Sequence, residues 1–350
     1  MRLAVVLVHY HAAELAGAAI AALRADLAGT GIETEWLLVD NGSDAAEREL
    51  LVGLGVERLD PGENLGYAGG VNLGAARARA DALLLMNPDV LVFPGCVPAL
   101  LARLQAGAAV AGPRFFWDRG RRLLLPPAEP RRRRDELAAM LAARGERWAA
   151  RARRRWRRHA RRHWRARAPL PSHALSGSLL AVRRDAWERA GPFDPAFRLY
   201  FEETDWLLRA ARRGLRAEHV PAAEAVHLVG RSAAREPRAP AWFEESARRF
   251  RRRHYGAAFT WTLAALDRRL PRRAPAAPAA APPDGPPRPC WVEVSPNPAG
   301  FPAAAERLET WSAGWTLPAE VRERMAGEPL VAQLTDAAGR ELARWSLGVA

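Results

Sequence analysis

Short apolar runs alternate with helix-like stretches through the first 110 residues, and this alternation constrains the fold more than any other feature of the chain. Four runs have the length and composition of buried strands, namely residues 3–8, 36–39, 56–59 and 82–86. Three other stretches have helical patterns, namely 12–27, 69–80 and 94–105. Strands that are joined by helices usually run parallel, because each helix returns the chain to the same edge of the sheet. The pattern therefore predicts an α/β fold with a mostly parallel twisted sheet flanked by helices.

An arginine-rich segment, residues 118–168, interrupts this pattern. Between positions 114 and 168 the chain has 20 arginines and 5 acidic residues, whereas the whole chain has a net charge of +14, so this segment holds the entire excess. The α/β pattern resumes at 175–182 and continues to about residue 255. We interpret the segment as a basic helical insertion into an α/β domain that spans residues 1–255.

Composition changes again after residue 255. Residues 256–289 are interpreted as a helix remnant and a linker rich in proline and alanine, which cannot build a core. Residues 290–350 contain four tryptophans and a hairpin-like passage at 330–342, which predicts a small β-rich module. We therefore expect three parts in the chain, namely the α/β domain (1–255), the linker region (256–289) and the C-terminal module (290–350).

Cysteine use and hydropathy limit the compartment. The two cysteines lie far apart and have no ligand-like spacing, which disfavours a disulfide framework or a zinc site and fits a reducing compartment. The apolar start of the chain is broken by His9, so we interpret it as the first strand and not as a signal peptide. No run of eighteen apolar residues is present, so no spanning helix is predicted. We expect a cytoplasmic protein, peripheral on the inner face of the membrane if it is membrane-associated.

Four polar islands follow predicted strands or begin predicted helices. They are Val39 to Ser43, Asn64 to Gly74, Met86 to Val90, and Phe201 to Trp206. Open α/β sheets place their ligand-binding loops at such positions. Together the islands suggest an enzyme that handles a sugar nucleotide.

The first two islands each allow two interpretations. The Asp40 carboxylate could accept hydrogen bonds from a nucleobase or ribose, or it could close an Asx-turn at the end of its strand. The glycine-rich run from Asn64 to Gly74 could let the backbone approach a ligand closely, or it could be a tight loop packed against the sheet. The run lacks the Gly-x-Gly-x-x-Gly spacing, which disfavours a dinucleotide site.

The remaining islands carry the candidate metal ligands and the candidate base. Asp89 could hold a divalent cation against a diphosphate. His227 could supply an imidazole ligand suited to Mn²⁺, or it could be a half-buried histidine with satisfied hydrogen bonds. Glu202, Glu203 and Asp205 begin a helix, where the helix dipole favours acidic residues in any case. Their aromatic neighbours also create the partly desolvated setting that raises a carboxylate pKa toward the general-base range.

In order and spacing, the islands resemble bacterial inverting glycosyltransferases of family 2 with the GT-A fold, and most closely the rhamnosyltransferase-like branch. The resemblance covers residues 3–255 apart from the insertion. It implies a nucleoside-diphosphate sugar donor, with L-rhamnose from dTDP-rhamnose favoured, and a divalent metal, Mg²⁺ or Mn²⁺. It also implies a hydroxyl of a cell-surface or lipid-linked glycan as the acceptor, as in polysaccharide synthesis for the cell envelope.

The resemblance also assigns roles to residues. Glu203 falls at the catalytic base, next to Glu202 and near Asp205, while Asp89 and His227 fall at the metal site. The donor-binding positions that it implies are Tyr10, Asp40, Asn41, Asn64, Gly66, Tyr67, Gly69, Asn72, Asn87, Asp89, Ser176, Gly177 and Arg231. The chain departs from the family in two places. His9-Tyr10-His11 replaces the common Asn-Tyr-Asn, and Asn87 occupies the first acidic position of the DxD-like element.

Alternative hypotheses remain, which concern the arginine-rich segment and a chain without catalytic activity. The segment carries Trp148, Trp156 and Trp164 among its arginines, a combination that suits nucleic acid or another polyanion. It could instead be a solvated arm produced by compositional bias, or it could dock on an anionic membrane surface through its arginines with Trp156 and Trp164 at the interface. A catalytically inactive family member is the third alternative, against which the presence of Asp89, Glu203 and His227 argues.

Overall fold

The computed structural model describes residues 1–228, 238–272, 286–312 and 314–348. The chain divides into two compact units, which we call the α/β unit (1–114 and 166–257) and the second unit (115–165 and 258–350). The arginine-rich insertion and the C-terminal module were expected as separate parts, but they belong to the same unit. The centre of the expected linker, 273–285, lies outside the described residues.

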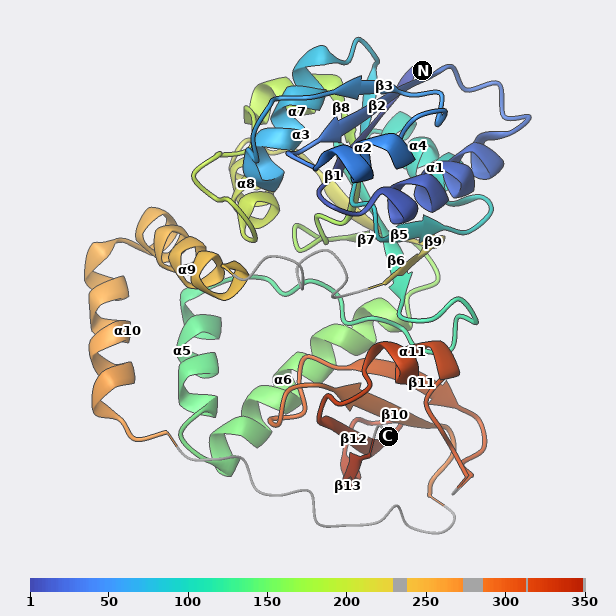
Figure 1. The fold of residues 1–350 in the computed structure, drawn as a ribbon. Coiled ribbons are helices and arrows are strands. Elements are labelled where there is room, and N and C mark those ends of the chain that lie inside the picture. Colours follow the sequence, from blue (N-terminus) through green and yellow to red (C-terminus); the bar gives the residue numbers. More distant parts are fainter. Residues whose placement is uncertain (229–237, 273–285, 313, 349–350) are drawn as a thin grey trace. The chain divides into compact units, whose positions relative to one another are not determined.

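One large sheet organises the α/β unit (Figure 1). In the described residues its strands are β1 (Leu3–His9), β2 (Thr34–Asp40), β3 (Glu57–Leu59), β4 (Ala82–Met86), β5 (Val90–Val92), β6 (Val110–Phe116), β7 (Leu170–Pro171), β8 (Leu179–Arg183) and β9 (Ala217–His227). Their order is β3-β2-β1-β4-β8-β6-β9-β5, with β7 paired to β9. The first four strands run parallel, and antiparallel pairs such as β4 with β8 and β5 with β9 complete the sheet. The predicted α/β class is confirmed.

Helices cover both faces of this sheet. The described helices of this unit are α1 (Ala13–Leu27), α2 (Ala45–Leu50), α3 (Gly66–Arg77), α4 (Cys96–Gln105), α7 (Arg184–Ala190), α8 (Glu202–Arg212) and α9 (Ala239–Tyr255), and α9 packs on α8. Alternate residues of β1, namely Ala4, Val6 and Val8, pack in one core cluster with α3, α7 and α8. The residues between them are equally buried and face the opposite side, where α1 and α4 lie together (Figure 1). Because both faces are buried, β1 is a continuous apolar run without alternation.

Two glycines of the glycine-rich run bring α3 close to β1. A Cβ atom on Gly70 would lie 2.7 Å from Cγ1 of Val8, and one on Gly74 would overlap Cγ1 of Val6. Larger residues at either position would push the helix away from the sheet. For this half of the run, the interpretation as tight packing against the sheet is correct.

The second unit pairs a helical part with an antiparallel sheet. Its helices are α5 (Arg133–Ala142), α6 (Glu146–Trp164), α10 (Ala257–Arg269) and α11 (Ala319–Arg324), and its strands are β10 (Cys290–Ser295), β11 (Ala304–Leu308), β12 (Leu330–Asp336) and β13 (Glu341–Leu347). The strand order is β11-β10-β12-β13. The predicted C-terminal β-rich module is therefore confirmed, and its hairpin consists of β12 and β13.

One face of α6 packs on this sheet (Figure 1). Trp156 and Trp164 are 4% and 6% exposed and form an apolar cluster with Trp291 of β10. The rings of Trp164 and Trp291 stack with their centroids 5.6 Å apart. The segment is therefore not a solvated arm, and the proposal that Trp156 and Trp164 rest at a membrane interface was wrong, because both indoles fill a core.

A buried ion pair joins the same face of α6 to the sheet. The Arg157 guanidinium, 2% exposed, donates from Nε to both carboxylate oxygens of Glu293 at 2.8 Å, and Glu293 is fully buried. Arg157 also donates from Nη2 to the side-chain oxygen of Gln333, and Arg161 donates to Thr335. Burial lowers the pKa of Arg161 to about 10. The insertion and the C-terminal module are therefore held together by charge as well as by apolar packing.

We expect Arg157→Met to lower the free energy of unfolding of the second unit by about 3–5 kcal/mol, because Glu293 would stay buried without its cation. Urea denaturation followed by tryptophan fluorescence measures this change. The double variant Arg157→Met/Glu293→Met is the matched control and should recover most of the loss, since no uncompensated charge remains. A single variant as stable as the wild type would contradict the ion pair.

No helix in the described parts of the chain is long and apolar enough to cross a membrane.

Candidate active site

A cleft of about 400 Å³ opens in the α/β unit where β1, β2 and β4 end. Because these strands are parallel, their carboxyl ends share one edge of the sheet. Twelve of the residues predicted for the site line the cleft, namely Tyr10, Asn41, Asn64, Gly66, Tyr67, Asn87, Asp89, Ser176, Gly177, Glu202, Glu203 and His227. Four others, namely Asp40, Gly69, Asn72 and Asp205, are not part of its lining. Arg231 lies outside the described residues.

Asp40 and His9 are buried polar residues at the base of the cleft, and His9 is part of its lining. One Asp40 oxygen accepts the Ser43 backbone N–H at 3.0 Å, and the other accepts Nε of Arg48 at 3.1 Å. Both carboxylate oxygens are therefore engaged inside the protein, as in the Asx-turn alternative. His9 Nδ1 accepts the Ala12 N–H, which places the ring proton on Nε2, 2.8 Å from Oγ of Ser43. Burial lowers the pKa of His9, so the cleft is bordered by a neutral imidazole.

Two asparagines fix the entry to α3. Asn41 Nδ2 donates to Oδ1 of Asn64 at 3.0 Å, and that same oxygen accepts the Gly66 N–H at 2.8 Å. Gly66 has φ of +72°, and a Cβ there would lie 2.6 Å from the carbonyl oxygen of Arg198. Only glycine fits both constraints. This turn brings the start of α3 against the segment that precedes α8.

Gly69 and Asn72 support α3 from outside the cleft. A Cβ on Gly69 would lie 2.7 Å from Cβ of Leu65, the residue just before the helix. Asn72 donates from Nδ2 to the Phe193 carbonyl and accepts the Phe193 N–H at Oδ1, both at 2.9 Å. Because both amide atoms hold this backbone, the structure does not support donor binding by Asn72. The family resemblance located residue 72 near the cleft but could not predict that its side chain points toward Phe193.

Asp89 and His227 meet on one wall of the cleft. Nε2 of His227 lies 3.4 Å from Oδ1 of Asp89, and Nδ1 of His227 lies 3.4 Å from Oγ of Ser178. Ligand atoms at about 2.1 Å from an octahedral cation are about 3 Å apart when adjacent, so the first separation suits two ligands of one ion. The buried Oδ1 of Asn87 has no hydrogen-bond partner in the described residues and supplies a further oxygen at this wall.

No group of three or more His, Cys, Asp or Glu side chains suited to a metal ion occurs within the described ranges. Asp89 and His227, with Asn87 Oδ1 beside them, would therefore need waters and substrate oxygens to complete the shell of a cation. Mg²⁺ is commonly bound in this way, through one or two carboxylates and the phosphates of a substrate.

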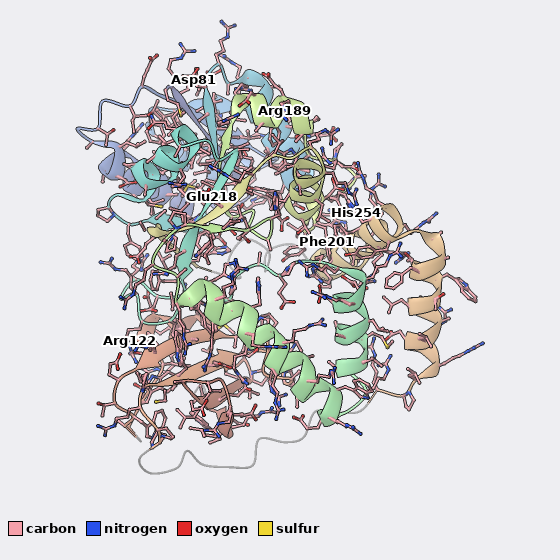
Figure 2. The ribbon with its side chains drawn as sticks, turned by 180° about the vertical axis from the view of Figure 1, so that it is seen from behind. Asp81, Arg122, Arg189, Phe201, Glu218 and His254 are labelled. Atoms are coloured by element: carbon pink, nitrogen blue, oxygen red, sulfur yellow. The ribbon has the colours of Figure 1, made fainter. Side chains whose placement is uncertain are left out.

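Strained backbone precedes α8. Tyr200 and Phe201 both have positive φ values, +68° and +72°, although neither is a glycine. Such residues cost about 1–3 kcal/mol each and occur mostly where the surrounding structure enforces them. Here the ring of Phe201, which is labelled in Figure 2, has its centroid 5.3 Å from that of Phe250 on α9. The strained turn directs Glu202 and Glu203, the first residues of α8, into the cleft.

The two glutamates occupy different environments. Glu202 is 5% exposed, and its Oε2 has no hydrogen-bond partner in the part of the chain that the structure describes. Burial, together with the charge of Glu203, raises its pKa well above the usual value. Glu203 is half-buried and accepts the Thr204 hydroxyl. Unequal burial moves the pKa values of two neighbouring carboxyl groups apart, as in sites where one acts as an acid and the other as a base.

The pKa of Tyr67 is sensitive to the acidic side chains of the cleft. Its hydroxyl donates to the Gly177 carbonyl at 2.9 Å. Burial raises its pKa well above 10, and the charges of Glu202, Glu203 and Asp89 raise it further. Gly177 is needed beside this group, because a Cβ there would lie 3.0 Å from Cβ and Cγ of Glu203.

Asp205 has a structural setting. It is fully buried and accepts hydrogen bonds at 2.8 Å from Arg209 and from Nε2 of His254 on α9, which is labelled in Figure 2. Burial alone would raise the pKa of Asp205, but the hydrogen bonds from His254 and Arg209 keep it below the usual value. We therefore correct its assignment as a catalytic residue. It ties α8 to α9.

Several residues of the cleft were missed by the sequence analysis. They are Val8, His9, Pro88, Ser178, Arg198, Leu199, Tyr200 and Trp242. Arg198 is the one cation among them, and its guanidinium lies 5.9 Å from the centre of the Trp242 ring. Its position shortly before the acidic helix could have marked Arg198, whereas no motif marks Trp242.

Comparison with known proteins gives the family. The model of the family described as glycosyl transferase family 2 matches residues 4–188. Over 218 residues the chain is 32% identical to the N-acetylglucosaminyl-diphospho-decaprenol L-rhamnosyltransferase of Mycobacterium tuberculosis, covering 57% of this chain and 68% of that protein.

Two solved structures are also similar. The mannosyltransferase PcManGT from Pyrobaculum calidifontis, in complex with GDP-Man and Mn²⁺, is 15% identical over 77% of this chain and 75% of that chain, with a TM-score of 0.47. TarS of S. aureus, residues 1–349, is 12% identical over 71% of this chain and 64% of that chain, also with a TM-score of 0.47. Because the family model spans more than half of the chain and the mycobacterial relative is matched over two thirds of its length, this chain belongs to glycosyl transferase family 2.

Proposed function

We propose that this glycosyltransferase moves a hexose, with inversion, from a nucleoside-diphosphate sugar to a hydroxyl of a lipid-linked glycan. The observation that carries the proposal is the composition of one cleft, which combines a half-buried carboxylate, Glu203, with the adjacent metal-type donors Asp89 and His227. General-base catalysis and stabilisation of a diphosphate leaving group require these two elements. Glu203 and His227 lie beyond the residues that the family model matches, so their assignment depends on this geometry.

The reaction is a single displacement at the anomeric carbon. The Glu203 carboxylate accepts the proton of the acceptor hydroxyl while that oxygen forms the new glycosidic bond. The bond from the anomeric carbon to the diphosphate oxygen breaks on the opposite face, so configuration inverts. Glu202, whose raised pKa favours the neutral form, limits the negative charge next to the base.

Asp89 and His227 are the residues that would hold a divalent cation, Mg²⁺ or Mn²⁺. When bound, such a cation neutralises charge on the departing nucleoside diphosphate. Asn41, Asn64 and Tyr67 line the same cleft. Asn41 and Tyr67 already bond Asn64, Leu65 and Gly177, so among the three we propose the Asn64 amide nitrogen as the group offered to the donor. A role for Arg231 near the diphosphate stays a prediction, since it lies outside the described residues.

The relative's name supports specific substrates. The mycobacterial relative is named as an L-rhamnosyltransferase that acts on N-acetylglucosaminyl-diphospho-decaprenol. We extend this to the present chain and favour dTDP-L-rhamnose as donor and a lipid-linked glycan of the cell envelope as acceptor.

A panel of nucleotide sugars tests this proposal. We expect dTDP-L-rhamnose to give the largest thermal shift and the fastest release of nucleoside diphosphate in the presence of Mn²⁺ or Mg²⁺. The same panel without metal is the control. A larger response to another sugar would replace the donor, and no release from any donor would favour the inactive family member.

The rival hypothesis of nucleic-acid binding loses part of its basis. Two of the three tryptophans that would stack on bases, Trp156 and Trp164, are buried in the second unit.

A further inference from the structure

Helix α6 carries two sets of arginines, one buried and one exposed. Arg153, Arg157 and Arg161 are buried and bonded to the sheet of the second unit or to the turns around it. A second set is exposed, and we call it the outer stripe: Arg147, Arg151, Arg154, Arg158 and Arg162. Its spacing of four, three, four and four residues follows the helical repeat, so the five side chains share one face.

The outer stripe is not neutralised within the protein. Among the described residues, none of its five guanidinium groups has a hydrogen bond or an ion pair with another side chain. The nearby carboxylates are engaged elsewhere, because Glu146 binds Arg153 and Asp135 binds Arg155. The stripe therefore presents five positive charges over about 22 Å of helix.

A hollow with an apolar margin lies beside the stripe. Helices α5 and α6 and the turn between β12 and β13 enclose a cavity of about 920 Å³, and no acidic residue is part of its lining. Trp148 and Leu137 border this cavity and are 46% and 39% exposed. Arginine binds phosphate oxygens through a planar fork of donors, while an indole is favoured at the boundary between water and lipid.

We propose that the outer stripe, together with Trp148 and Leu137, docks on the phosphate-rich surface of an anionic phospholipid bilayer. Charge complementarity supplies the attraction, and the two apolar side chains supply insertion at the interface. A bilayer is favoured over single-stranded nucleic acid because Trp156 and Trp164, which could have stacked on bases, are buried. This inference concerns the second unit alone and does not depend on the proposed reaction.

The test replaces three arginines of the stripe in the full chain. Each basic residue near an anionic surface contributes about fivefold to binding, so Arg151→Gln/Arg154→Gln/Arg158→Gln should weaken binding to phosphatidylglycerol vesicles about a hundredfold at low salt. Glutamine preserves the helix, and these side chains have no partners to lose. A triple variant with the same change of charge, Arg189→Gln/Arg212→Gln/Arg213→Gln in α7 and at the C-terminal end of α8, is the matched control and should bind nearly as the wild type does.

Vesicle sedimentation also compares lipid composition, salt concentration and the Trp148 variant. We expect binding of the wild type to phosphatidylglycerol vesicles, no binding to phosphatidylcholine vesicles, release at high salt, and weaker binding of Trp148→Ser. Equal sedimentation with both lipids, or equal losses in the two triple variants, would overturn the proposal. Tighter binding to single-stranded DNA than to vesicles, lost in the stripe variant, would overturn it in favour of a polyanion site. Release of nucleoside diphosphate in every variant tests the proposed reaction separately.

Deleting the whole insertion, residues 119–167, would not test the outer stripe by itself. It would also remove Arg157 and Trp164, which cover Glu293 and Trp291 of the sheet. Point substitutions on the exposed face avoid this loss.

Discussion

Glu203→Gln is expected to lower the rate of sugar transfer by about a hundredfold or more, within the range of general-base catalysis. Glutamine has nearly the same shape as glutamate but cannot accept the proton of the acceptor hydroxyl. Because Glu203 is assigned to proton removal, the affinity for the nucleotide sugar should stay near that of the wild type. Steady-state transfer rates and calorimetric binding of the donor separate the two effects.

Glu202→Gln is the matched control. The high pKa of Glu202 favours its neutral form, which glutamine imitates, so we expect less than a tenfold loss of rate, on the order of 1 kcal/mol in the barrier. Equal losses in both variants would remove the distinction between the two glutamates. Transfer by Glu203→Gln within a few-fold of the wild-type rate would exclude Glu203 as the base. Asp205→Asn should instead lower the thermal stability, since Asp205 binds Arg209 and His254.

Removal of divalent cations is expected to abolish transfer. If Asp89 and His227 share an ion, activity should fall to background in EDTA and return on addition of Mn²⁺ or Mg²⁺. Asp89→Ala should weaken the binding of nucleoside diphosphate in the presence of the metal and leave it unchanged without metal. Calorimetry with and without Mn²⁺ measures this difference.

The control for Asp89→Ala is Asp185→Ala, which removes a carboxylate that is 53% exposed and is not part of the cleft. It should keep the metal dependence of the wild type. Full activity in the chelator would remove both Asp89 and His227 from the metal role.

The sequence by itself determined the layout of the α/β unit. Buried parallel strands must be apolar on both faces, and their carboxyl ends share an edge, so β1, β2 and β4 could be located together with the polar residues that follow them. Asn41, Asn87 and Asp89 lie in the cleft for this reason. The direction of neighbouring side chains could not be predicted in the same way. Asp40 and Asn72 belong to the same motifs, yet their polar atoms are used by Arg48 and by the Phe193 backbone.

Only the tertiary structure decided the fate of the arginine-rich segment. Composition showed a cluster of positive charge, but its division into a buried and an exposed face depends on a partner more than a hundred residues away in the chain. Glu293 binds Arg157, and Trp291 stacks on Trp164, while no acidic partner faces the outer stripe in the described residues. A local pattern gives the helical repeat of α6. Which face is buried follows from the surface that the helix meets, and that contact is non-local.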